Sequence, residues 1–311
     1  MPCMDKRTFL KTMTAAGAVG VAGISHAKSG YDPSARMAVR VSEVEYRRTA
    51  KGRSLLARIY QPQGDGPFPM VLDLHGGAWS GKDRYANEPM SRAVAESGVI
   101  VVAIDMTLAA EAPYPASVQD AHYAVRWMKA KAASWKGDPA TLGLIGSSTG
   151  GHIAELVMMR PNDKRYAAHA LPEAPNVDAS VLYVAARSPI SDPWARYQNA
   201  VNRKRENLIK SSQAWFVPWE SIHEANPQEM LERKEKLTLK PMLIMQGELD
   251  DNVLPPVQEK FAATYRAAGG ECRYELYEKC EHEWTGRPGP MTDRAHEMVR
   301  QFIARNLQAK G

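Results

Sequence analysis

Short apolar segments alternate with longer segments of helical spacing along most of the chain. Two stretches in which apolar and polar residues alternate predict an opening β-hairpin, at "VSEVEYRR" and "SLLARIYQP". Continuous apolar runs, which are typical of strands buried in a parallel sheet, follow at "FPMVLDLH", "GVIVVAID", "TLGLIG", "VDASVLYVAA" and "KPMLIMQG". A final strand is predicted at "CRYELYE".

Segments of helical spacing separate these strands. The clearest is "PASVQDAHYAVRWMKAKAASW", in which one helical face would carry Val118, Ala121, Ala124, Val125 and Met128. Further helices are predicted at "HIAELVMMR", "PVQEKFAATYRAAGG" and "DRAHEMVRQFIARNLQ". This alternation predicts an α/β fold with a mainly parallel central sheet and helices on both of its faces.

The regular alternation stops between about residues 189 and 239. That segment is polar and aromatic, and its aromatic residues include Trp194, Tyr197, Trp215, Phe216 and Trp219. We interpret it as a cap-like insertion into one domain that spans residues 41–311, with residues 28–40 as a linker.

Residues 1–27 have the parts of an export signal. A short basic region precedes a weakly apolar core, and a small-x-small cleavage site ends at Ala27. The core is shorter than the ~20 residues of a transmembrane helix, so we expect no stable membrane insertion. The run "KRTFLK" resembles a twin-arginine signal with Lys6 in place of the first arginine, which leaves the twin-arginine and general secretory routes open. We expect an exported, periplasmic protein; a disordered amphipathic tail is the alternative.

The composition is that of an ordinary globular enzyme, with 311 residues, 44% hydrophobic, 24% charged and a net charge of +5. The basic residues are scattered, which argues against nucleic-acid binding. No Cys/His cluster has the spacing of a metal site, so we expect no metal and no other cofactor. A disulfide between Cys272 and Cys280 is not expected, because a strand would hold them ~20 Å apart, against ~5.5 Å between the Cα atoms of a disulfide. A homo-oligomer is compatible with the sequence.

The segment "LGLIGSSTGGHIAEL" places two adjacent serines between a predicted strand and a predicted helix. A G-x-S-x-G motif in this position is typical of the sharp turn that exposes a nucleophilic serine. Gly146, Ser148 and Gly150 match the motif, whereas Ser147 lacks glycines two positions before and after it. Ser148 is therefore the predicted nucleophile. A phosphate-binding turn is the alternative for a glycine-rich loop of this kind.

A second glycine motif ends the strand in "LDLHGGAWSG". Acyl transfer requires N–H donors for a tetrahedral oxyanion, and glycines let the backbone approach a substrate closely. We predict the backbone N–H groups of Gly76 and Gly77 as two donors and that of Thr149, the residue after the nucleophile, as a third. A simple glycine turn is the alternative, and the presence of both motifs in this order argues against it.

Together these motifs resemble those of α/β-hydrolases of the HGG-motif group, which includes hormone-sensitive-lipase-like esterases, small carboxylesterases and arylformamidases. The resemblance extends from about residue 41 to the C-terminus and implies an α/β-hydrolase fold with a Ser-Asp-His triad. The chain departs from the pattern at two points. Ala78 replaces the third glycine of HGGG, and the D-Y-R-L element reads Asp105-Met106-Thr107-Leu108, which argues against the hormone-sensitive-lipase branch itself.

The catalytic order of this fold is serine, then the acid, then histidine. The resemblance places the acid at Asp250 in "GELDDNVLPP", with Asp251 and Glu248 as alternatives. It places the base at His282 in "EKCEHEW". His152, which opens the helix after the nucleophile, is poorly placed as a base.

These residues predict a serine carboxylesterase that forms an acyl-enzyme with a small-molecule ester. His282 would accept the Ser148 hydroxyl proton, and Asp250 would orient the imidazole. Trp79 and Trp284 are predicted to line a pocket for a small or aromatic group, with packing against the sheet as the alternative. Two other functions remain open: an amidase, arylformamidase or peptidase with the same triad, and a binding protein that has lost catalysis.

Overall fold

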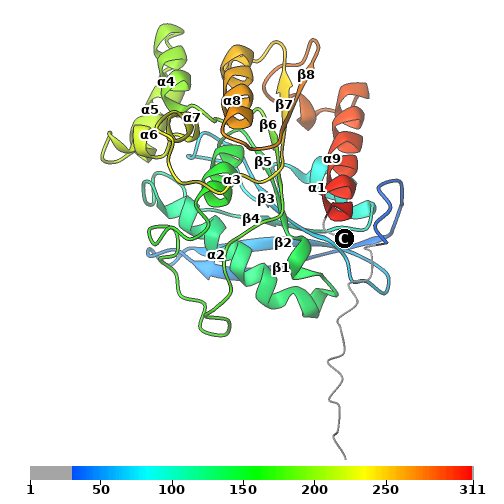
Figure 1. Ribbon diagram of the computed structural model, residues 1–311. Coiled ribbons are helices and arrows are strands. Elements are labelled where there is room, and N and C mark those ends of the chain that lie inside the picture. The colour runs from blue at the N-terminus through cyan, green and yellow to red at the C-terminus, as the bar shows by residue number, and fades with distance from the viewer. Residues whose placement is uncertain (1–29, 310–311) are drawn as a thin grey trace, which may run out of the picture.

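A sheet of eight strands forms the centre of the computed structural model, which describes residues 30–309 (Figure 1). The strand order is β1-β2-β4-β3-β5-β6-β7-β8. The strands are β1 (Val39–Arg48), β2 (Ser54–Pro62), β3 (Met70–Leu74), β4 (Ile100–Ile104), β5 (Gly143–Ser147), β6 (Val184–Arg187), β7 (Met242–Gly247) and β8 (Cys272–Tyr277). The predicted export signal and the first residues of the predicted linker lie outside the described residues.

The sheet is mainly parallel. β1 and β2 form the predicted antiparallel hairpin, and β2 also pairs antiparallel with β4. All pairs from β4 to β8 are parallel. The predicted α/β fold is therefore confirmed. Strand β6 is shorter than predicted, because residues 177–183 of "VDASVLYVAA" are irregular and the strand starts at Val184.

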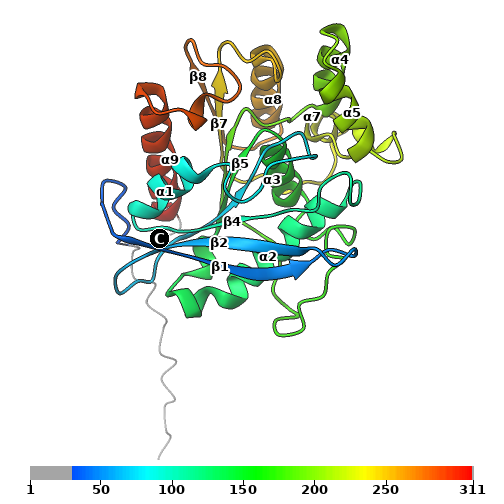
Figure 2. The same cartoon turned by 180° about the vertical axis from the view of Figure 1, so that it is seen from behind.

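Helices cover both faces of the sheet. Helices α1 and α9 pack on one face, and α2, α3 and α8 pack on the other, as Figures 1 and 2 show. The helices are α1 (Glu88–Glu96), α2 (Ala116–Lys131), α3 (Thr149–Met159), α4 (Pro193–Asn202), α5 (Glu206–Trp215), α6 (Ser221–Glu224), α7 (Pro227–Glu232), α8 (Pro255–Ala267) and α9 (Pro290–Gln308). Short 3-10 turns occur at η1 (Ala132–Trp135), η2 (Pro139–Thr141) and η3 (Trp284–Gly286).

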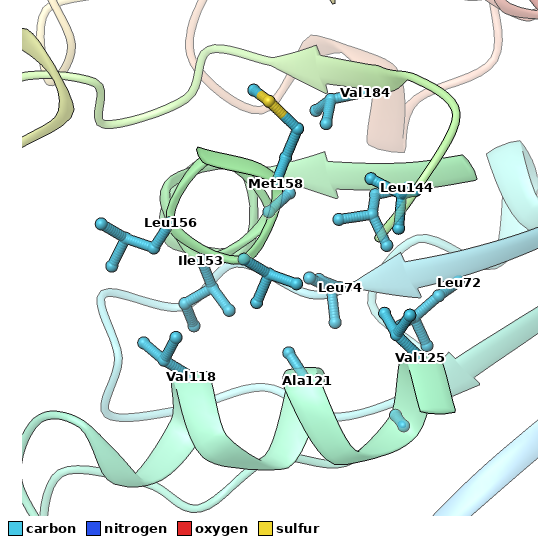
Figure 3. Packing of buried hydrophobic residues seen from close by; sticks show 14 of the residues in the cluster. Leu72, Leu74, Val118, Ala121, Val125, Leu144, Ile153, Leu156, Met158 and Val184 are labelled. Carbon is cyan, nitrogen blue, oxygen red and sulfur yellow. The ribbon is translucent and has the colours of Figure 1, made fainter. Parts of the chain in front are cut away.

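Alternate residues of the buried strands face the two layers, because successive side chains of a strand point to opposite faces. On β3, Leu72 and Leu74 belong to the core under α2 and α3, and Val71 belongs to the core under α1 and α9. Figure 3 shows the first layer, with Leu72, Leu74, Val118, Ala121, Val125, Leu144, Ile153, Leu156 and Val184. This packing holds the parallel strands in register and leaves the loops at their carboxyl ends to carry the site.

The segment for which the sequence predicts no regular pattern contains helices α4 to α7. Asp192 and Asn226 cap α4 and α7 through side-chain oxygens that accept backbone N–H bonds. These helices lie together in both views, and α7 contacts α3 and α8 (Figures 1 and 2). The division of the chain into one domain and a cap-like insertion stays a prediction.

Cys272 and Cys280 are both buried and free. Between residues 30 and 309, no helix combines the length and apolar character that a membrane span requires. In the same residues, no group of His, Cys, Asp and Glu side chains has a metal-binding arrangement.

Candidate active site

Ser148 occupies the turn between β5 and α3, with φ 54° and ψ −117°. The turn is possible because its flanking residues lack side chains. A Cβ atom on Gly146 would lie 2.6 Å from the Gly150 carbonyl oxygen, and one on Gly150 would lie 2.0 Å from the carbonyl oxygen of Leu74. Both distances are far below van der Waals contact, so glycine is sterically required at these two positions.

The structure brings Ser148, His282 and Asp250 together from the ends of β5, β8 and β7. The Nε2 atom of His282 lies 2.9 Å from Oγ of Ser148, and its Nδ1 atom lies 2.7 Å from Oδ2 of Asp250. Both distances are within the range for proton transfer and for orientation of the imidazole by the carboxylate. The serine and the aspartate are buried, and the histidine is partly buried.

The Asp250 carboxylate is held in the ionised form. Its Oδ1 atom accepts the backbone N–H bonds of Asn252 and Val253 at 3.0 and 2.9 Å, and Gln246 donates to Oδ2. Burial alone would raise the pKa of Asp250, but the hydrogen bonds from His282 and Val253 outweigh burial and lower this pKa. A charged Asp250 favours the imidazole tautomer with a proton on Nδ1, which leaves Nε2 free to accept a proton.

The alternative acids and bases lie elsewhere. Asp251 forms ion pairs with two arginines near the ends of α4 and α5. Glu248 accepts the backbone N–H of Lys279 at 2.8 Å. His152 is fully buried, and its Nε2 atom donates to the backbone carbonyl of Ala225 at 2.7 Å. In the described part of the chain, none of these three side chains forms a hydrogen bond with Ser148.

The predicted oxyanion loop lies directly beside the nucleophile. A Cβ atom on Gly76 would lie 3.0 Å from the carbonyl oxygen of Ser147 and 3.2 Å from Cβ of Ser148, so glycine lets the two segments approach closely. Between residues 30 and 309, the N–H groups of Gly76, Gly77 and Thr149 have no backbone acceptor. His75 is buried, and its Nδ1 atom donates to the Gly76 carbonyl at 2.7 Å, which orients this peptide. The role of the three N–H groups as oxyanion donors stays a prediction.

The loop turns sharply after these donors. The Gly77 carbonyl accepts N–H bonds from Ser80 and Gly81, both at 3.0 Å. Ala78, at the position of the missing third glycine, and Trp79 adopt φ values of 52° and 58°. This region of φ is unfavourable for residues with a side chain, so the loop keeps its turn at an energetic cost.

The two predicted pocket residues lie in different surroundings. The Trp79 indole is 4% exposed and stacks on Trp215 at 4.9 Å, within an aromatic cluster under the α4–α5 segment. Trp284 is 8% exposed and stacks on Tyr277 at 4.3 Å, in the core beneath α9. Both side chains therefore pack as core residues, and their contact with a substrate stays a prediction.

Ser147, the excluded serine, belongs to a buried polar network that the sequence does not reveal. Its Oγ atom donates to Asn87 at 2.9 Å, and Asn87 donates to the carboxyl of Asp73 at 2.8 Å. Ser91 donates to the other oxygen of Asp73. Burial raises the pKa of Asp73 to about 6, against the effect of these hydrogen bonds. The only sequence signal is a charged residue within the apolar run "VLDL".

Comparisons with known proteins agree with this fold. The family model described as BD-FAE matches residues 58–264. The carboxylesterase NlhH of Mycobacterium tuberculosis is 29% identical over 254 residues, which cover 80% of this chain and 72% of that protein. A probable isoprenylcysteine alpha-carbonyl methylesterase of Oryza sativa subsp. japonica is 24% identical over 243 residues, or 76% of this chain and 57% of that protein.

Solved structures show the same fold. The thermophilic esterase Est2 of Thermogutta terrifontis, with butyrate bound, has a TM-score of 0.67 and 21% identity, and the match covers 86% of this chain and 94% of that chain. The form of the same esterase phosphorylated by paraoxon also has a TM-score of 0.67. Since the family model covers most of the chain, we conclude that the protein belongs to the BD-FAE family of α/β-hydrolase esterases and is a serine hydrolase of the carboxylic ester hydrolase class.

Proposed function

We propose that this protein hydrolyses small carboxylic esters through a Ser148–His282–Asp250 triad and an acyl-enzyme. The observation that carries the proposal is the unbroken hydrogen-bond path from the serine hydroxyl through the imidazole to a buried carboxylate, with distances of 2.9 and 2.7 Å. A chance meeting of these three side chains is improbable, since they come from the ends of three separate strands.

In the first half-reaction, Oγ of Ser148 attacks the ester carbonyl carbon as Nε2 of His282 takes the hydroxyl proton. The carbonyl oxygen becomes an oxyanion, which faces the N–H groups of Gly76, Gly77 and Thr149. Preorganised donors of this kind contribute about 3 kcal/mol each to the transition state of acyl transfer. Collapse of the intermediate breaks the ester bond, and the alcohol leaves with the proton from His282.

In the second half-reaction, water attacks the acyl-enzyme. His282 takes a proton from the water, and the acid is released as Ser148 regains its proton. The charge of Asp250 stabilises the imidazolium in both halves, and the bonds from Asn252 and Val253 keep the carboxylate oriented.

The two adjacent serines provide the test and its control. With p-nitrophenyl acetate or butyrate, Ser148→Ala should lower kcat by a factor of about 10⁴ or more, because the nucleophile is removed. Ser147→Ala, which removes only the bond to Asn87, should keep kcat within about tenfold of the wild-type value. A fluorophosphonate should label wild-type protein at Ser148. Equal activity of both variants, or labelling of another serine, would contradict the proposal.

We further propose that the protein prefers aromatic esters. Trp79, two residues after Gly77, packs with Trp215 and Phe216 in an aromatic cluster, which would form one wall of an acyl or alcohol pocket. Trp79→Ala should change the ratio of kcat/KM values for phenylacetate and butyrate esters. An unchanged ratio would remove Trp79 from the pocket.

Matched p-nitrophenyl esters and anilides would separate esterase from amidase activity.

We also propose export of the protein, which rests on the sequence of residues 1–27 alone. Expression of the full chain in a Gram-negative host should yield periplasmic protein that begins at Lys28. A cytoplasmic product that retains Met1 would contradict this localisation.

A further inference from the structure

Arg187, the last residue of β6, is a buried cation beside the candidate site. The residue is 5% exposed. Its backbone carbonyl accepts the N–H of Ser148 at 2.9 Å. Its guanidinium NH1 donates to the backbone carbonyl of His282. One residue therefore contacts the backbone of both the candidate nucleophile and the candidate base.

The place of Arg187 in the sheet explains these two contacts. It pairs with Ser147 on β5 and with Met245 on β7, so it lies between the strand that leads to Ser148 and the strand that leads to Asp250. Its side chain spans the carboxyl end of the sheet and reaches the loop after β8, which carries His282. His282 lies in a loop outside any strand, and the Arg187 guanidinium is one of the groups bonded to the backbone of that loop.

The electrostatic surroundings show that the guanidinium is not a simple ion-pair partner. Burial is the largest effect on Arg187 and lowers its pKa, although Glu283 and Asp250 favour the charged form. The nearest carboxylate oxygen belongs to Glu283 at 3.8 Å, and that oxygen also accepts from Lys82 at 2.8 Å. Because removing a cation from water costs several kcal/mol, a neutral carbonyl as its main acceptor indicates a local geometric role.

We propose that Arg187 is a positioning residue that holds the His282 loop so that the imidazole stays within reach of Ser148. This inference rests on the proposed function. The planar guanidinium suits the task, because its fixed fork can donate to the carbonyl of His282 while a second nitrogen faces Glu283. Glu283 and Lys82 extend the connection to the residue that follows the oxyanion turn. Arg187 makes no contact with the predicted oxyanion donors in the described chain, so its loss should affect turnover more than substrate binding.

The test compares Arg187→Met and Arg187→Lys with the wild-type protein on p-nitrophenyl butyrate, each well below its melting temperature. Since small displacements of a catalytic group can cost up to about 10²-fold in rate, R187M should lower kcat by about 10- to 100-fold, with KM within about threefold. R187K keeps one donor and should recover part of this loss, to a kcat about three- to tenfold below wild type. Fluorophosphonate labelling of Ser148 should slow in the same order.

Arg300 on α9 provides a matched control, because it is also buried and pairs with Glu297 far from the triad. R300M should lose stability but keep the wild-type kcat. A wild-type kcat for R187M would overturn the inference. If R187M does not fold, a wild-type kcat and labelling rate for R187K would overturn it instead. A wild-type protein that hydrolyses no ester would overturn the proposed function together with this inference. An active wild type with an equally active Arg187 variant would overturn this inference alone.

Discussion

At the scale of single residues, the site depends on positions where a side chain would not fit. Gly146 and Gly150, two residues before and after Ser148, have backbone neighbours too close for a Cβ atom, and Gly76 leaves little room for one. These glycines are also the residues that made the sequence informative, since the spacing of the motif separates Ser148 from Ser147 without any structure. The glycine motif in the sequence therefore reflects the steric requirement of the turn.

Gly150→Ala provides a direct measure of this requirement. The new Cβ would lie 2.0 Å from the carbonyl oxygen of Leu74, which is backbone and cannot rotate away. We expect a loss of unfolding free energy of about 1–3 kcal/mol or more in urea titrations, together with a loss of esterase activity. Gly286→Ala is the control, because a Cβ there meets no atom within 4 Å. Equal stability of the two variants would show that the turn relaxes easily.

Glu155, on α3, should give the protein a pH-dependent stability that does not involve catalysis. It is fully buried, and its Oε1 atom accepts from Ser191 at 2.7 Å. Burial raises its pKa to about 8. A glutamate in the unfolded chain has a pKa of about 4.3. The stability that neutral, buried Glu155 contributes is therefore fully present below that pH and is lost as the pH rises towards the folded pKa.

Glu155→Gln should therefore stabilise the protein relative to wild type increasingly between about pH 4.3 and pH 8, by about 1 kcal/mol per pH unit. Urea unfolding at several pH values measures this difference. Glu259→Gln, on the exposed side of α8, is the control and should show no comparable trend. A difference that stays constant across this pH range would mean that Glu155 is ionised in the folded protein as well.

The candidate site residues differ in whether the sequence alone indicates them. Motif spacing and chain order indicated Ser148, Gly76, Gly77 and His282, because local steric and topological rules govern those positions. The family resemblance favours Asp250 over Asp251, and the hydrogen bond between Asp250 and His282 agrees with that choice. Arg187 could not be predicted as part of the site, because its role depends on the meeting of β6 with a loop 95 residues further along the chain.

At the scale of elements, periodicity predicted the helices that pack on the sheet with a long apolar face. It missed α1, which has nine residues and buries only Met90, Ser91, Val94 and Ala95. It also missed α4 to α7, of which α6 and α7 have four and six residues, too few for a repeating pattern. Periodicity misses such helices because a helix stabilised by caps and tertiary contacts need not have an amphipathic period.

Figure 3 shows side chains of α2, α3 and β3 packed together in the larger core. Leu156 of α3 has no exposed surface there. Leu156→Ala should lower the free energy of unfolding by about 2–5 kcal/mol, because a cavity forms beneath the nucleophile's helix. Urea denaturation followed by circular dichroism measures the loss. Leu249→Ala, at a residue 56% exposed, should change stability by no more than about 0.5 kcal/mol. Similar losses for both variants would contradict this packing.

At the scale of the whole molecule, the two core layers enclose both cysteines of the described chain. Cys272 and Cys280 are 6% and 5% exposed. Burial raises the pKa of Cys272 to about 12 and also raises that of Cys280. Thiols react as thiolates, so both should resist alkylation in the folded protein.

Iodoacetamide at neutral pH should therefore modify Cys272 and Cys280 slowly in the native protein and completely in denaturant. Peptide mass spectrometry distinguishes the two sites. Rapid modification in the native state would show that β8 separates from β7 at the edge of the sheet. A disulfide between the two thiols in protein recovered from the periplasm would contradict the structure at this edge.

The turn at Ala78, Trp79 and Ser148 has a consequence for protein engineering. Three non-glycine residues with φ between 52° and 58° stand at one site, and such conformations cost of order 1–3 kcal/mol each. A selection for heat resistance alone would favour glycine at Ala78, since glycine adopts this φ freely. The same change would give more conformational freedom to the loop that carries the predicted oxyanion donors. Variant libraries of this esterase should therefore be screened for turnover after heating. A screen for heat resistance alone would favour stable variants that have lost activity.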